Sequence, residues 1–183
     1  MRIISGKYKS RKIFTPGIKD PKKNLIRPTS DRAREMIFDV LQSRLDLEGA
    51  SCLDLFSGTG AIGFECISRG AGSCNFVDIL WKSHDLIMKT ADELGCRENI
   101  SFFKKDALSF LNGTGEEYFD LIFADPPYDY PNFKKLSDEV LKRKFGVFIL
   151  ESGQDISSPS AEKDFEVLNK KVGYTHFKFF ITT

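Results

Sequence analysis

The sequence has few of the residues from which metal sites and disulfide frameworks are built. Its 183 residues include two histidines and four cysteines, and no two cysteines form a C-x-x-C pair. We therefore expect free, buried thiols and no metal, as in a reducing cytosol. No run is long and apolar enough to cross a bilayer, and the first twelve residues lack the apolar core of a signal peptide. A cytoplasmic protein without a membrane partner is expected.

The net charge is small, but the charged residues are unevenly distributed. The formal net charge is +1, yet residues 1–34 contain eleven Lys and Arg against two Asp and Glu. The remainder of the chain is therefore acidic. A basic segment on an acidic body is typical of a protein with a polyanionic partner such as nucleic acid, and a solvated tail is the alternative.

The first forty residues predict a basic extension followed by a helix. Two short strands, "RIIS" and "RKIFTP", are expected on either side of the tip "GKYKS", and residues 15–30 have the composition of a loop. "TSDRAREMIFDVLQSRL" predicts a helix capped by Thr29 or Ser30. Its expected apolar stripe consists of Ala33, Ile37, Val40 and Leu41. We divide the chain into residues 1–30, a hairpin and loop extension, and residues 31–183, the main domain.

From residue 51 onward, strand patterns alternate with helix patterns. The expected strands are "SCLDLFS", "SCNFVDI", "ISFFKKD", "YFDLIFAD" and "FGVFILES", and the expected helices are "AIGFECISR", "KSHDLIMKTADEL" and "FKKLSDEVLK". This alternation predicts an α/β fold with a mainly parallel, doubly wound sheet. A hairpin around Gly173 is expected to add an antiparallel strand. The single tryptophan, Trp81, is expected to serve packing.

A glycine-rich loop follows the first of these strands. In "DLFSGTGAIG", Gly58, Gly60 and Gly63 have the G-x-G-x-x-G spacing that brings backbone close to a ligand between a strand and a helix. Asp78 ends the next strand, where a carboxylate can bind a ribose diol. The pattern leaves a nicotinamide-dependent dehydrogenase and a ligand-free turn open. Asp54, inside the strand, suits the cationic end of S-adenosylmethionine better than a pyrophosphate.

Two further strand ends carry polar groups. Asp106 can accept a hydrogen bond from an adenine amino group or cap a helix. "Asp125-Pro126-Pro127-Tyr128" ends the fourth strand, where open α/β sheets bind ligands. Because prolines lack an N–H and fix φ, this loop presents acceptors suited to a conjugated NH₂ group. Tyr128 offers a face for a flipped base. A rigid surface turn is the alternative.

Several segments together resemble a known family. "MRIISGKYKSRKI", "RPTSDRAREMIFDVL", "LDLFSGTGAIGFECISRGA" and "FADPPY" are similar to the RsmD-type 16S ribosomal RNA guanine-N2 methyltransferases, which are class I S-adenosylmethionine-dependent enzymes. The resemblance implies a Rossmann-like fold and methyl transfer to a guanine N2 amine. It also implies a monomer acting on 16S rRNA within the 30S subunit or an assembly intermediate. Adenine-N6 methyltransferases of DNA or RNA and protein glutamine-amide methyltransferases share the proline motif and remain alternatives.

The resemblance also assigns roles by position. Cofactor binding is expected at Thr29, Asp54, Phe56, Gly58, Gly60, Asp78, Ile79, Asp106 and Ala107. The target amine is expected at Asp125, Pro126, Pro127 and Tyr128. RNA backbone is expected at Lys7, Lys9, Arg11, Lys12 and Arg27. Two positions depart from the family pattern: Ser10 stands where glycine is usual, and Asp78 where glutamate is common.

Overall fold

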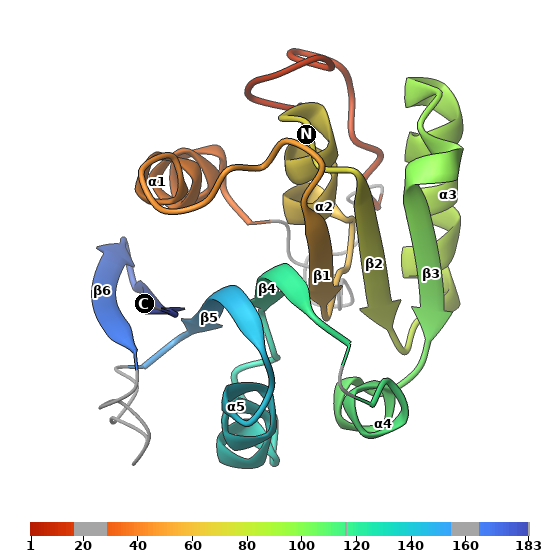
Figure 1. Cartoon of the computed structure of the whole chain (residues 1–183). Helices are drawn as coiled ribbons and strands as arrows, with labels where there is room; N and C mark the ends of the chain where they lie inside the picture. The colour runs from red at the N-terminus through yellow and green to blue at the C-terminus, as the bar shows by residue number, and fades with distance from the viewer. Residues whose placement is uncertain (17–28, 116, 155–164, 183) are drawn as a thin grey trace.

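The structure is a computed structural model that describes residues 1–16, 29–115, 117–154 and 165–182. In this part of the chain, seven strands form one sheet in the order β3-β2-β1-β4-β5-β7-β6 (Figure 1). Their bounds are β1 Ser51–Leu55, β2 Ser73–Asp78, β3 Ile100–Lys104, β4 Phe119–Ala124, β5 Phe145–Ser152, β6 Glu166–Val172 and β7 Thr175–Ile181. Strands β1 to β5 are parallel, and β7 pairs antiparallel with both β5 and β6. The predicted doubly wound sheet with a C-terminal antiparallel hairpin is confirmed.

Helices cover both faces of the sheet. One layer contains α1 (Asp31–Leu41), α2 (Ala61–Ser68) and α3 (Trp81–Leu94), and the other contains α4 (Ala107–Gly113) and α5 (Phe133–Leu141); a short 3₁₀ helix, η1 (Arg97–Asn99), precedes β3 (Figure 1). Each layer buries its own apolar cluster against the sheet, and all four cysteines are buried free thiols as predicted. No described helix is long and apolar enough to cross a membrane.

Some local predictions hold and others need correction. The Ser30 side chain caps α1 by accepting from the Ala33 N–H at 3.2 Å. The predicted stripe is buried except for Val40, which is partly exposed. Helix α4 was not foreseen beyond the possible cap at Asp106. Trp81, expected to serve packing, instead starts α3 with 60% of its surface exposed.

The amino-terminal arm, residues 1–14, forms an antiparallel bridge between Arg2 and Lys12 where two short strands were expected. It packs on α2 and α3, because Ile3, Tyr8 and Ile13 are buried in the same cluster as those helices. The Lys7 N–H donates to the carbonyl of Ser68, the last residue of α2, at 2.6 Å. Since α2 runs back from the carboxyl end of β1 to the amino end of β2, the basic tip lies at the amino edge of the sheet.

A buried carboxylate joins the arm to the helices. Glu65, in α2, is fully buried and accepts the backbone N–H groups of Ile4 and Ser5, each at 2.9 Å. It also pairs with Arg34 of α1 at 3.4 Å and with Arg69 at 3.1 Å. Arg34 is itself fully buried and donates to the Arg2 carbonyl at 2.7 Å. Since a buried charge is tolerated only when paired and hydrogen-bonded, this cluster fixes the arm, α1 and α2 relative to one another.

The backbone at Ser10 generates a prediction about stability. Ser10 has φ 67°, in the left-handed region, at the position where the resemblance predicts glycine. This region costs an ordinary L-residue about 1–2 kcal/mol, and glycine adopts it freely but loses more entropy on folding. Ser10→Gly should therefore raise the free energy of unfolding by about 0.5–1 kcal/mol, measured by urea denaturation.

The exposed Ser101 in β3 provides a matched control, because its φ is not positive. Ser101→Gly should lower the free energy of unfolding by about 0.5–1 kcal/mol. Equal losses for the two variants would show that the left-handed backbone at Ser10 carries no strain.

Candidate functional site

The predicted cofactor and target-amine residues that follow the strands are brought together at the carboxyl edge of the parallel sheet. Strands β3, β2, β1 and β4 are neighbours in the sheet, so the loops that follow them lie side by side. Backbone hydrogen bonds tie two of these loops to the neighbouring strands: the Ser57 N–H donates to Val77 O of β2 at 3.1 Å, and the Asp125 N–H to Leu55 O of β1 at 3.5 Å. Loops that are distant in sequence thereby form one surface, as expected for a ligand site in an open α/β sheet.

The glycine loop after β1 contains three left-handed residues. Phe56, Gly58 and Gly60 have φ of 59°, 52° and 75°. A Cβ atom at Gly63 would lie 2.3 Å from the Phe76 ring, so this glycine is required for the contact of α2 with β2. The loop thus turns sharply between β1 and α2, as its glycine spacing predicted. The left-handed Phe56 costs stability, and such strain is concentrated at functional sites.

Asp54 places a buried carboxyl group beneath this loop. It is 3% exposed, and its Oδ2 accepts from the Gly63 N–H at 3.1 Å. Burial raises the pKa of Asp54 well above its ordinary value of 3.8, the Gly63 N–H partly offsets this, and the charges of Asp125 and Asp78 raise the pKa further. A cationic ligand group here would relieve the repulsion among three carboxylates.

Ser57 supplies a second sign of a ligand. Its hydroxyl is buried, and it has no hydrogen-bond partner within the described part of the chain. Buried hydroxyl groups usually have a partner, so an orphaned one in a candidate ligand loop is informative. The loop therefore offers an unused polar group close to the strand that carries Asp54.

Asp78, predicted to bind a ribose, organises the edge of the site. Its Oδ2 accepts from the Gly58 N–H at 2.9 Å and its Oδ1 from the Leu80 N–H at 2.8 Å. One carboxylate therefore connects the glycine loop to the end of β2. The next residue, Ile79, is 62% exposed and is available for contact with a ligand.

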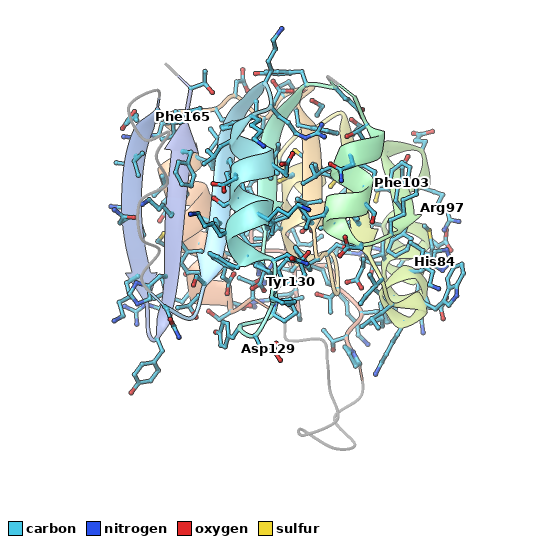
Figure 2. All side chains as sticks on the ribbon, turned by 90° about the horizontal axis from the view of Figure 1, so that it is seen from below. His84, Arg97, Phe103, Asp129, Tyr130 and Phe165 are labelled. Carbon is cyan, nitrogen blue, oxygen red and sulfur yellow. The ribbon has the colours of Figure 1, made fainter. Side chains whose placement is uncertain are left out.

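Tyr130 lies at the candidate site, although it was not predicted from the sequence. Its hydroxyl donates to Asp106 Oδ2 at 3.3 Å, and its ring meets that of Phe56 edge-on at 5.1 Å. Burial raises the pKa of Tyr130, and the charge of Asp106 raises it further. Figure 2 shows Tyr130 beside Asp129 in the loop after β4. The only signal for it was a second tyrosine two residues after the proline motif.

Asp106 also caps α4, which was the alternative role predicted for it from the sequence. Its Oδ1 accepts from the Ser109 N–H at 3.1 Å, and the buried Ala107 is the first residue of the helix. The carboxylate thus connects α4 to the loop after β4. These bonds fix its position at the end of β3, next to β2, where an adenine is expected.

The proline loop itself forms a tight turn. The Tyr130 N–H donates to Pro127 O at 2.8 Å, and Pro126 is buried. Tyr128 is 60% exposed, and a Cβ atom added at Gly153 would lie 3.0 Å from its ring. The glycine after β5 therefore leaves room for the exposed tyrosine ring.

The predicted RNA-binding residues do not join this group. Lys7, Lys9, Arg11 and Lys12 are exposed on the amino-terminal arm, whose tip lies at the opposite edge of the sheet. Arg11 donates to the Glu93 carbonyl at 2.8 Å and pairs with the Glu93 carboxylate at 3.5 Å. Arg27 lies outside the described residues, and Thr29 directly precedes the cap of α1.

Among the described residues, no three His, Cys, Asp or Glu form a potential metal site.

Comparisons with known proteins determine the family. The family described as "Conserved hypothetical protein 95" matches residues 1–181. Ribosomal RNA small subunit methyltransferase D of Buchnera aphidicola is 31% identical over 173 residues, which cover 93% of this chain and 86% of that protein. The chain belongs to the RsmD-type methyltransferase family. The methyltransferase class predicted from the sequence is thereby confirmed.

Solved structures support the fold of this methyltransferase. The Escherichia coli protein yhhF, described as a methyltransferase, has a TM-score of 0.81 at 24% identity and covers 100% of this chain and 97% of that one. SMU.776, described as a methyltransferase complexed with SAH, has a TM-score of 0.62 at 17% identity and covers 81% and 49%. Both structural similarities support a Rossmann-like fold over most of the chain.

The buried carboxyl of Asp54 predicts a pH-dependent loss of stability. Because its pKa is higher in the folded protein than in the unfolded chain, its ionisation opposes folding. This penalty is absent below about pH 4 and grows as the pH rises toward the folded pKa. Asp54→Asn should therefore be more stable than wild type at neutral pH, by about 1.4 kcal/mol for each unit of pKa elevation.

Urea denaturation of both proteins between pH 4 and 8 measures this difference. The two curves should converge at the acidic end and separate as the pH rises. A constant difference across the range would show that Asp54 does not titrate with a raised pKa in the folded protein.

Proposed function

We propose that this methyltransferase transfers a methyl group from S-adenosylmethionine to the N2 amine of a guanine in 16S rRNA. The observation that carries the proposal is the adjacency of two groups at one sheet edge. Asp54 and the glycine loop lie at β1, and the acceptors of residues 125–128 follow the neighbouring strand β4. Relatives named as ribosomal RNA small subunit methyltransferases support an rRNA substrate.

The residues at the edge fit the chemistry of this cofactor. S-adenosylmethionine supplies an electrophilic methyl carbon on a cationic sulfonium, together with an ammonium group and a ribose. The buried Asp54 carboxyl suits the cationic portion, and the orphaned Ser57 hydroxyl suits a polar atom of the ligand. Asp78 and Ile79 would contact the ribose, and Asp106 and Ala107 the adenine. The remaining proposed contacts are Thr29, Phe56, Gly58 and Gly60.

The proline loop would hold and orient the target amine. Asp125 and the Pro126 carbonyl would accept its two N–H groups, which directs the nitrogen lone pair at the methyl carbon. The N–C bond would form as the C–S bond breaks, and Asp125 or solvent would accept the extra proton. Such positioning can supply about 7–11 kcal/mol of the barrier. The exposed Tyr128 ring would stack on the flipped guanine.

Several finer features belong to the same proposal. The partner would be 16S rRNA within the 30S subunit or an assembly intermediate, and the enzyme would act as a cytoplasmic monomer. Residues 1–30 would form an RNA-binding extension of the catalytic domain, residues 31–183. The exposed lysines of the arm support this role, although their distance from the site means that they would contact RNA remote from the target base.

The loop predicts an ordered series of catalytic defects. Asp125→Ala should reduce the rate of methyl transfer about a hundredfold to a thousandfold, comparable to loss of a group that acts in the transition state. Tyr128→Ala should be the next most damaging, because it removes the stacking ring. Tyr128→Phe should be nearly silent, because stacking needs the ring and not the hydroxyl. Single-turnover assays at saturating cofactor measure this order.

Cofactor affinity and circular dichroism serve as controls for each variant. Both should remain at wild-type values, since the proposed role of the loop is in binding substrate. An Asp125→Ala enzyme that is folded, binds S-adenosylhomocysteine and turns over normally would contradict the proposed role.

A further inference from the structure

Trp81 is an exposed aromatic residue that the site described above does not use. It begins α3 three residues after Asp78, at the carboxyl end of β2, and 60% of its surface is exposed. The neighbouring Ile79 is 62% exposed. Exposed apolar residues that adjoin one another and are surrounded by polar residues are typical of interaction sites. The position is therefore a candidate contact surface on the same edge as the proposed methyl-transfer site.

Neighbouring side chains hold the indole in place. The Lys104 ammonium lies 4.7 Å from the centre of the Trp81 ring. The His84 ring meets the indole edge-on at 5.3 Å and meets Phe102 at 5.2 Å. Figure 2 shows His84 on the β3 side of the molecule. An aromatic ring that is oriented by its neighbours loses little freedom when a flat ligand stacks on it.

The charge around the indole favours a polyanion. Lys82, Lys104 and Lys105 are exposed, and Lys104 lies beside Asp78 in the register of β2 and β3. The acidic neighbours in the group are Asp85, which pairs with His84 at 3.0 Å, and Asp78, whose carboxylate oxygens accept the backbone N–H groups of Gly58 and Leu80. Lysines beside an exposed aromatic ring match single-stranded nucleic acid, because phosphates bind the cations while a base stacks on the ring.

We propose that Trp81 and Lys104 form a second nucleotide-binding point for single-stranded RNA, distinct from the target base at Tyr128. The inference rests on the proposed function for its choice of RNA. Strands β2 and β4 flank β1. The loops that carry the two binding points therefore leave the sheet about two strand spacings, or about 10 Å, apart. One RNA segment can therefore occupy both, with a base near the target stacked on Trp81 and its phosphate on Lys104.

Trp81 is the only tryptophan in the chain, so its fluorescence reports directly on this point. The full-length protein would be titrated with single-stranded oligoadenylate, which contains no guanine and so separates binding from methyl transfer. Stacking should quench the indole emission. S-adenosylhomocysteine alone should not reproduce this quenching.

Substitutions test the stacking and the charge separately, using the anisotropy of labelled oligoadenylate. Trp81→Ala should raise Kd about 5- to 150-fold, whereas Trp81→Phe should retain most of the affinity. Lys104→Gln should make the salt dependence of binding shallower by about 0.7 for one lost phosphate contact. Tyr174→Ala is the matched control, because this 92% exposed tyrosine lies in the β6–β7 turn at the far side of the sheet.

The outcomes distinguish this inference from the proposed function. Quenching by S-adenosylhomocysteine but not by RNA would assign Trp81 to the cofactor and overturn the inference. Wild-type affinity in a folded Trp81→Ala protein, or an equal loss for Tyr174→Ala, would also overturn it. An enzyme that binds RNA through Trp81 but transfers no methyl group to any RNA would instead refute the proposed function.

Discussion

The arrangement of the helical layer depends on one buried carboxylate, that of Glu65. It satisfies two backbone N–H groups of the amino-terminal arm and balances the charges of Arg34 and Arg69. Such a cluster is stable only when every member is present, because removing one partner leaves a buried charge unpaired. The bond from the Lys7 N–H to the carbonyl of Ser68, the last residue of α2, then places the tip of the arm at the amino edge. The exposed lysines at the tip of the arm are thereby held away from the candidate site.

The carboxyl edge of the sheet differs from the amino edge, because it contains unfavourable interactions that a ligand can relieve. Carboxyl groups from Asp54, Asp78 and Asp125 interact unfavourably there, and Phe56 has left-handed backbone. The parallel sheet supports these features because its strands are buried between two helical layers. Stability is thus concentrated in the core, and the strand ends have the polarity required to bind a cationic cofactor.

Local backbone chemistry explains which features could be predicted from sequence. The glycine loop and the double proline restrict φ directly, so their places at strand ends followed from spacing and from strand–helix alternation. The burial of Arg34, the exposure of Trp81 and the contacts of Tyr130 could not be predicted in the same way. Each depends on which distant segments pack alongside: Arg34 meets Glu65 across two helices, and Tyr130 meets Asp106 across two loops.

Methyl transfer to a guanine amine, directed by acceptors in the proline loop, is the proposed reaction. Its most direct test uses S-adenosylmethionine with a labelled methyl group, offered with total RNA, DNA and protein from a strain that lacks the enzyme. Nuclease digestion and mass spectrometry then identify the modified nucleoside. We expect label in small-subunit RNA as N2-methylguanosine. Label in DNA, in protein or in N6-methyladenosine would contradict it.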